Sequence, residues 1–246
     1  MKVLAVTSQK GGSGKTTLAG HIAVEAERAG YGPVAIIDTD PQGSLTDWWN
    51  EREAASPSFV QAQIETLEAD LQRAREHGFA LVVIDTPPAI TGTIEKVIGL
   101  ADLVVVPTRP SPHDLRAVGT TIEMVESQGK PLVFIVNAAN PRARITSEAA
   151  IVLSQHGTVA PVTVHQRTDF AAAMIDGRTV MEIDRADRSC DEIVRLWAYL
   201  DGRLNGNSQA TLMPSSFADL PGVLSQPARH KVPLTASSPH AAASPP

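Results

Sequence analysis

Cysteine is almost missing from this chain, since its 246 residues include only one, Cys190. A single cysteine forms no disulfide within the chain, and it cannot supply the thiolates of a zinc or iron–sulfur cluster. The sequence therefore excludes disulfide-stapled and cluster-bearing proteins. Because chains without disulfides are typical of the reducing cytosol, we expect a cytoplasmic protein.

Long apolar runs are also missing. No stretch approaches the ~20 apolar residues that a membrane-spanning helix needs. The apolar run before Gln9 is too short for the central region of a signal peptide. We therefore expect neither secretion nor a membrane partner.

Positive charge is in short supply, because the chain carries a formal net charge of −6. A protein that coats nucleic acid over its whole surface needs many clustered cations, so that class is excluded. The arginines are sparse before residue 100 and frequent after it. Any face that binds nucleic acid is therefore expected in the second half of the chain.

Short apolar runs rich in β-branched residues recur between longer amphipathic stretches. They cover residues 2–7, 34–37, 81–84, 103–106, 132–136 and 159–164. Several are apolar on both faces, as the strands of a parallel sheet are when helices cover both of its sides. The sequence predicts an α/β fold with a doubly wound, mostly parallel sheet and helices on both faces.

Helices are predicted over residues 16–29, 64–77, 112–128, 146–156 and 189–204. The first four are followed by a glycine that can adopt a left-handed C-cap, namely Gly30, Gly78, Gly129 and Gly157. The last helix carries apolar residues at helical spacing, which predicts a face packed on the core: Ile193, Leu196, Trp197 and Leu200.

The composition changes near residue 205, where Ser, Pro, Ala and Gly replace most large apolar residues. Such a segment buries too little apolar surface to offset its ordering entropy. We expect a folded domain over residues 1–204 and a disordered tail over 205–246. The alternative for part of this tail is that residues 217–224 dock a partner.

The segment QKGGSGKTT follows the first predicted strand directly and precedes a predicted helix. Its glycines allow a tight turn that aims backbone N–H groups at phosphate oxygens, and the helix N-terminus adds partial positive charge. In such a loop Lys15 pairs with the β and γ phosphates and the Thr16 hydroxyl binds Mg²⁺. The predicted ATP contacts are Lys10, Gly11, Gly12, Ser13, Gly14, Lys15, Thr16 and Thr17. The chain departs from the common phosphate-loop pattern at Gln9, where that pattern has glycine, and it adds Lys10.

Acidic residues follow two further predicted strands. Asp38 and Asp40 end the run VAIIDTD, at the edge of the sheet where α/β proteins bind ligands. One carboxylate can support Mg²⁺ while the other orients an attacking water. Asp85 ends the run LVVID, in the manner of a Walker B aspartate that holds Mg²⁺. A plain turn at residues 40–43 and a strand-capping aspartate at Asp85 are the structural alternatives.

These motifs resemble the ParA family of partition ATPases. The resemblance is carried by KGGSGKTT, IDTDPQGS, VVIDTPP and VVVPTRPSPHDLRAVGTT and extends to about residue 204. The family belongs to the deviant Walker class, which also holds MinD-like and nitrogenase iron-protein-like members. Because a strand is expected from residue 2, the chain most resembles short plasmid-type members, which have no N-terminal DNA-binding extension.

The resemblance implies several roles. Lys10 is the extra lysine that reaches across an ATP-sandwich homodimer to the partner's phosphates, where it acts like an arginine finger. Asp40 positions the hydrolytic water, and Asp38 supports Mg²⁺. Asn137 contacts adenine, although capping of a loop is an alternative for an asparagine at a strand end. ATP-bound dimers bind DNA without sequence preference, and the candidate residues are Arg167, Arg185, Arg188 and Arg195. Nearby acidic residues leave a salt-bridged surface helix as the other interpretation.

The function implied is that of a slow switch ATPase on the nucleoid. Its ATP dimer holds DNA, and a ParB-like or other adaptor bound to a cargo stimulates hydrolysis. A metabolic ligase that uses ATP to activate a small carboxylate is the alternative. A MinD-like membrane protein would need a basic amphipathic helix near the C-terminus, which the sequence does not provide. The cargo is a plasmid, a chromosome or a protein assembly, and the sequence does not decide among them.

Overall fold

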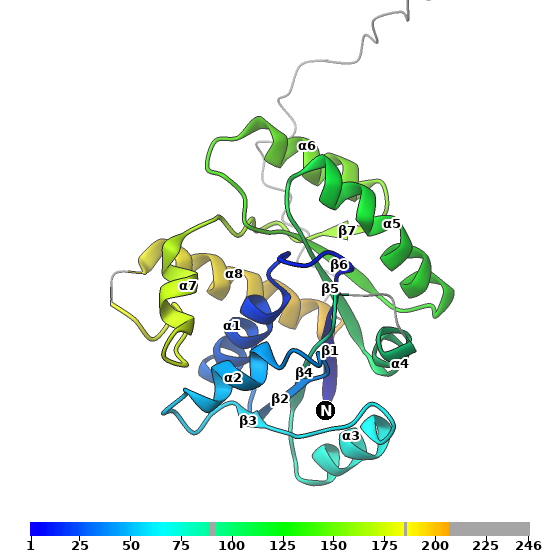
Figure 1. The fold of residues 1–246 in the computed structure, drawn as a ribbon, viewed down its shortest axis with the longest axis vertical. Coiled ribbons are helices and arrows are strands. Elements are labelled where there is room, and N and C mark those ends of the chain that lie inside the picture. Colours follow the sequence, from blue (N-terminus) through cyan, green and yellow to red (C-terminus); the bar gives the residue numbers. More distant parts are fainter. Residues whose placement is uncertain (89–91, 185, 207–246) are drawn as a thin grey trace, which may run out of the picture. The chain divides into compact units, whose positions relative to one another are not determined.

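The computed structural model describes residues 1–88, 92–184 and 186–206. In these residues seven strands form one sheet, and every paired strand is parallel to its neighbour (Figure 1). The order is β3-β2-β4-β1-β5-β6-β7. The strands are β1 Lys2–Val6, β2 Val34–Asp38, β3 Ser58–Phe59, β4 Leu81–Asp85, β5 Leu103–Thr108, β6 Leu132–Val136 and β7 Thr158–Val159.

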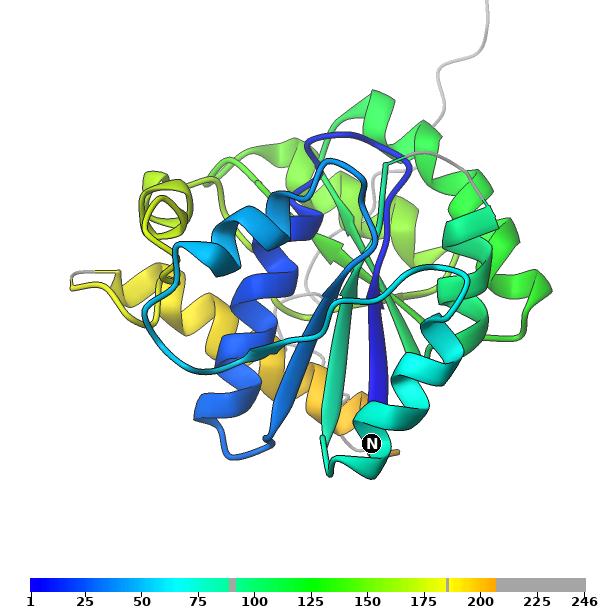
Figure 2. The same ribbon diagram turned by 60° about the horizontal axis from the view of Figure 1, so that its bottom comes forward.

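Helices cover both faces of the sheet, as Figure 2 shows. One face packs against α1 Lys15–Arg28, α2 Ser44–Asn50, α7 Thr168–Met174 and α8 Asp187–Leu204. The other packs against α3 Leu67–Glu76, α4 Gly92–Leu100, α5 Pro112–Ser127 and α6 Arg144–Ser154. Within β1, Leu4 and Val6 enter the first core while Val3 and Ala5 enter the second, because side chains alternate along a strand. The predicted doubly wound α/β fold is confirmed.

The helix ends follow the glycine pattern in three cases of four. Gly30, Gly78 and Gly129 have φ values of 81°, 82° and 63°. Gly157 does not adopt a positive φ, so that C-cap prediction is wrong. Glycine is favoured there by close packing, since a Cβ at this position would lie 3.2 Å from the Phe134 ring. The four apolar residues expected on the core face of α8 are all buried.

The strand predicted over residues 159–164 is wrong, because the structure has only the two-residue strand β7. Pro161 has no N–H to continue a ladder, and the chain beyond it follows β6 irregularly, with the Val164 N–H donating to the Val136 carbonyl at 3.0 Å. Strand β3 and helices α2, α4 and α7 were not anticipated. No helix in the described ranges is both long and apolar enough to cross a bilayer.

The tail expected over 205–246 lies outside the described residues, except for Asn205 and Gly206.

Candidate nucleotide site

The glycine-rich loop joins the end of β1 to the start of α1. Gly12 and Gly14 have φ values of 74° and 91°, which residues other than glycine rarely adopt. A Cβ on Gly14 would also lie 2.2 Å from the Asn137 amide nitrogen. Gly14 is therefore required both by its backbone conformation and by its neighbour.

The two lysines of the loop differ in exposure. Lys15 begins α1 and is 7% exposed, and burial lowers the pKa of its ammonium group while Asp85 and Asp40 oppose that shift. Lys10 is exposed, and its backbone N–H donates to the Ser8 hydroxyl at 3.4 Å. One cation therefore lies inside the site, while the other is open to a group outside this subunit.

Thr16 and Asp85 meet at the ends of α1 and β4. The Thr16 hydroxyl donates to Asp85 Oδ2 at 2.6 Å, and the Thr86 N–H donates to Asp85 Oδ1 at 3.0 Å. Asp85 is 1% exposed, and burial raises the pKa of its carboxyl group to about 7, against the stabilising hydrogen bond from Thr16. Two oxygens predicted to serve Mg²⁺ are thus adjacent.

Asp38 and Asp40 have different surroundings. Asp38 Oδ2 accepts hydrogen bonds from the N–H groups of Leu45 and Thr46 and from the Thr46 hydroxyl, so its carboxylate caps the start of α2. Asp40 lines the pocket beside the loop, and its Oδ1 accepts from the Gln42 N–H at 3.0 Å. The pairing of β2 with β4 brings Asp38 beside Asp85. The metal role of Asp38 stays a prediction, because its carboxylate here holds α2.

A pocket of about 870 Å³ opens beside the loop. Its lining from the loop consists of Gly11, Gly12, Gly14, Lys15, Thr16 and Thr17. Helix α2 lines another part, and Met174 and Ile175 line the pocket from the end of α7. Ile175 is 78% exposed, which is unusual for so large an apolar side chain.

The donor set fits a magnesium nucleotide. In the described ranges no group of three or more His, Cys, Asp or Glu residues is placed to hold a metal by itself. Mg²⁺ commonly uses one or two protein oxygens together with phosphate oxygens, which agrees with the Thr16–Asp85 pair. The buried Ser13 hydroxyl also lacks a hydrogen-bond partner in the described part of the chain. The Ser13 hydroxyl is therefore available to form a hydrogen bond with a phosphate ligand.

Asn137 follows β6 and is buried against the loop. Its Nδ2 donates to the Ser13 carbonyl at 2.7 Å. This geometry supports the loop-capping alternative, and the adenine contact stays a prediction.

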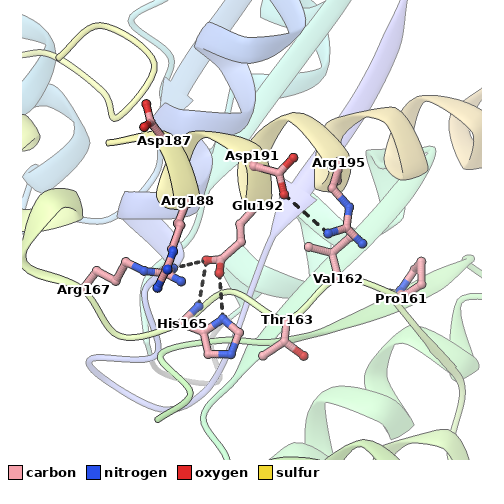
Figure 3. Close-up of a pocket in the computed structure, with 10 residues that line it drawn as sticks. All are labelled: Pro161, Val162, Thr163, His165, Arg167, Asp187, Arg188, Asp191, Glu192 and Arg195. Carbon is pink, nitrogen blue, oxygen red and sulfur yellow. Dashed lines mark hydrogen bonds and ion pairs between the residues drawn. The ribbon is translucent and has the colours of Figure 1, made fainter. Parts of the chain in front are cut away.

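A second pocket, of about 410 Å³, gathers three of the four arginines predicted to bind DNA (Figure 3). Arg167 Nη1 donates to Glu192 Oε2 at 2.6 Å, and Arg195 pairs with Asp191 at 3.4 Å. Arg188 is exposed and has no ion pair with another residue of the described part. Arg185 lies outside the described residues.

Glu192 organises this second pocket. Its side chain is 10% exposed and, besides Arg167, accepts hydrogen bonds from the His165 backbone N–H at 3.0 Å and from His165 Nδ1 at 2.7 Å. Glu192 is one of the acidic residues near the candidate arginines that favoured a salt-bridged surface helix. The structure instead shows it holding the segment before α7 against α8.

Three further residues near the glycine-rich loop were missed, and none of them lines the second pocket. Met174 and Ile175 come from a helix that the sequence did not predict. Arg109, which follows β5, places Nη1 4.0 Å from the position of a Cβ on Gly12. Two signals for Arg109 were available, namely its place inside the motif VVVPTRPSPHDLRAVGTT and its position shortly after a predicted strand, at the edge where ligands bind.

Comparison with known proteins adds evidence that is independent of this geometry. A family model described as the CobQ/CobB/MinD/ParA nucleotide binding domain matches residues 4–180. The chain is 33% identical over 200 residues to maintenance of carboxysome distribution protein A of Halothiobacillus neapolitanus, covering 77% of this chain and 92% of that protein. It is 28% identical over 171 residues to the chromosome-partitioning ATPase Soj of Thermus thermophilus, covering 58% and 66%. A solved Cyanothece McdA–ATP complex superposes with a TM-score of 0.68 at 20% identity, covering 84% of this chain and 96% of that one.

Proposed function

Because the chain belongs to the CobQ/CobB/MinD/ParA family of nucleotide-binding proteins, we propose that it is an ATP-driven positioning switch. In this cycle ATP and Mg²⁺ bind at the loop, two subunits dimerise over the nucleotides, and the dimer holds DNA without sequence preference. An adaptor bound to the cargo stimulates slow ATP hydrolysis, and the DNA is then released. The protein is nucleoid-associated while ATP is bound.

The observation that carries this proposal is the contrast between the two lysines. Lys15 is buried where its ammonium group faces the acids of its own site. Lys10 is exposed on the same loop, so its charge is available to phosphates bound by a second subunit. A cation supplied from a partner stabilises the charge of a phosphoryl-transfer transition state only in the dimer, which couples hydrolysis to assembly.

The residues of the site divide the remaining work. Thr16, Asp85 and Asp38 would hold Mg²⁺, which neutralises phosphate charge when it is bound. The loop N–H groups bind the phosphates. Asp40, which lines the pocket and is less buried than Asp85, orients the attacking water.

Dimerisation is supported by the apolar rim of the pocket. Ile175 is mostly exposed, and it lines the same pocket as Met174 and the loop. An exposed apolar side chain beside a polar ligand site is a feature of surfaces that become covered on association. A second copy that closes over the nucleotide would cover Ile175 as well.

DNA binding is assigned to the second pocket, with Arg188 as its main phosphate contact. Arg167 is engaged by Glu192, and Arg195 is partly engaged by Asp191. Arg188 alone among these three has no acidic partner in the described part, so its guanidinium is available to a backbone phosphate.

The cargo is proposed to be a large protein assembly. The relative named for carboxysome distribution is matched over 92% of its length, whereas the chromosome-partitioning relative is matched over 66%. A plasmid or a chromosome is the alternative cargo for the same switch.

The test is retention of DNA by the purified full chain with ATP and Mg²⁺, with ADP, and without nucleotide. The proposal expects retention only with ATP and faster hydrolysis when DNA and the adaptor are both present. Equal retention in all three conditions would remove the switch. Hydrolysis that depends on a small carboxylate and ignores DNA would identify a ligase instead.

A further inference from the structure

A groove of about 330 Å³ runs between α5 and α6, on the face of the sheet opposite to α1 and α8. Its apolar lining includes Val118 and Ile122 from α5 and Val152 and Leu153 from α6. Neither the nucleotide pocket nor the pocket around Glu192 shares a lining residue with it. The groove is therefore separate from both sites described above.

Gly119 lies in the interior of α5 and lines this groove. Glycine is the poorest helix former after proline, so a glycine in mid-helix usually has a reason in the backbone or in packing. Its φ is not positive, and a Cβ built on it meets no atom within 4 Å. By contrast, a Cβ on Gly20 in α1 would lie 3.4 Å from the Trp48 ring. Packing within the described part of the chain therefore does not explain Gly119, which leaves an open notch in the helix surface.

One apolar side chain that lines this groove is exposed, and its neighbour in α6 is exposed as well. Ile151 and Val152 are consecutive residues of α6 and are 49% and 38% exposed. Only four large apolar side chains are exposed in the described part of the chain, and these are two of them. A hollow with a buried apolar floor and an exposed apolar residue in its lining is typical of a surface that another chain covers.

The charge at one end of the groove is negative. Glu123 and Glu126 line it from the second half of α5, and both are exposed without an ion pair to any described residue. Arg116 lies near the other end, about 10 Å before Glu123 along the helix axis at 1.5 Å per residue. The chain as a whole has a net charge of −6, which also attracts basic partners. The complementary ligand is an apolar segment with lysine or arginine at one end.

We propose that the α5/α6 groove docks a short amphipathic segment of a partner protein. An apolar side chain of that segment fills the notch at Gly119, and its basic residues pair with Glu123 and Glu126. The identity of the partner rests on the proposed function, which assigns a cargo adaptor to this role. The existence of the docking site rests on the groove alone.

The test selects from a phage-displayed library of random 14-residue peptides on the immobilised full chain. The enriched peptides are expected to be net positive and to carry apolar residues three or four positions apart. Gly119→Leu should weaken the binding of these synthesised peptides by about tenfold or more, because it fills the notch at the centre of the contact. Reversal of charge in Glu123→Lys should weaken binding, and replacing the peptide's basic residues by glutamate should restore it.

Two variants separate docking from folding. Gly119→Ala removes a poor helix former without meeting any atom, so the melting temperature is expected to rise by roughly 2–4 °C while peptide affinity falls. Thr120→Leu places a leucine at the next exposed position of α5, which does not line the groove, and should leave peptide affinity unchanged.

The outcomes also separate this proposal from the proposed function. The Gly119 variants should still bind DNA in the presence of ATP, because the groove shares no lining residue with the nucleotide pocket or with the pocket around Glu192. Three results would overturn the docking site: no enriched peptide, enriched peptides without basic residues, or equal affinity for wild type and Gly119→Leu. Self-association of the full chain that Gly119→Leu abolishes would also overturn it, because the groove would then be a contact between copies of this chain.

Discussion

The Thr16 hydroxyl donates a hydrogen bond of 2.6 Å to the Asp85 carboxylate, and so joins the start of α1 to the end of β4. The two residues come from motifs 69 positions apart in the chain. Thr16 lines the pocket and Asp85 lies buried directly behind it, so two hard oxygen atoms of the kind that Mg²⁺ prefers are adjacent beside the loop.

Removing the Thr16 hydroxyl should remove the magnesium dependence of nucleotide binding. We expect Thr16→Val to lower ATP affinity in the presence of Mg²⁺ by about tenfold or more, as losses around metal ligands commonly do. ATP affinity is measured with Mg²⁺ and with a chelator. Thr39→Val is the matched control, because the Thr39 hydroxyl donates only to the Asp85 backbone carbonyl. An unchanged magnesium effect in Thr16→Val would contradict the assignment.

The two lysines should separate binding from assembly. Lys15→Ala is expected to lose about 3 kcal/mol of ATP binding, roughly a hundredfold, because a charge-assisted contact disappears. Lys10→Ala should bind ATP almost normally but should neither dimerise with ATP nor hydrolyse it. Nucleotide titration and size-exclusion chromatography give the two readouts. A Lys10→Ala protein that forms the ATP dimer would rule out a role across the interface.

Asp40 should be needed for hydrolysis rather than for binding. Asp40→Ala is expected to slow hydrolysis by roughly a hundredfold or more, since a group that positions or activates water contributes at this level. The ATP dimer should then accumulate. Asp47→Ala is a suitable control, because Asp47 lines the same pocket from α2. If Asp40→Ala hydrolyses ATP at the original rate, a group other than Asp40 orients the attacking water.

Arg188 and Arg167 should differ in their effect on DNA. Arg188→Ala is expected to weaken DNA retention and to reduce the slope of log affinity against log salt by about one, since one phosphate contact is lost. Arg167→Ala should mainly lower thermal stability, because it leaves the buried Glu192 carboxylate without its guanidinium. If Arg188→Ala keeps the full salt slope, the DNA phosphate is bound elsewhere.

His21 predicts a loss of stability in mild acid. The buried ring donates from Nδ1 to the Thr17 carbonyl and accepts at Nε2 from the Val180 N–H, and burial lowers its pKa from 6.5 to about 4. The unfolded chain binds the proton on His21 more readily than the folded chain does. The contribution of the neutral ring to the free energy of unfolding is therefore complete above pH 6.5 and is lost as the pH falls through 4. The loss is on the order of 3 kcal/mol. Denaturant unfolding between pH 7 and pH 4 should show a shallower decline for His21→Gln than for wild type. If the free energy of unfolding falls equally with pH in both proteins, His21 does not contribute to the loss of stability in acid.

The sequence predicted the parts of the fold that strong local patterns specify. The apolar strands and the long amphipathic helices were found, and the resemblance to the ParA family is confirmed by the family match. Helices α2 and α7 were missed because each has only seven residues and depends on tertiary partners. The start of α2 is capped by Asp38 from six residues before the helix, a contact that no local cap pattern indicates.

At the candidate site, too, features that are local in sequence could be predicted, and features that depend on tertiary contacts could not. The glycine-rich loop between β1 and α1 could be located because its glycines and lysine are adjacent in sequence. The difference in ion pairing between Arg167 and Arg188 could not be predicted, because it depends on which guanidinium reaches Glu192, a residue 25 positions from Arg167. Likewise, Asn137 lies against Ser13 only because β6 and the loop end at the same edge of the sheet.

In the described part of the chain strand β1 lies between β4 and β5, with two further strands outside each of these neighbours. The glycine-rich loop therefore follows the central strand of the sheet, whereas α2 and α7, which line the pocket, are peripheral helices of seven residues each. Changes in these two helices should then alter the walls of the pocket and leave the loop itself unchanged. Evolution could accordingly retune how long the bound state lasts by altering the two peripheral helices while the chemistry stays intact.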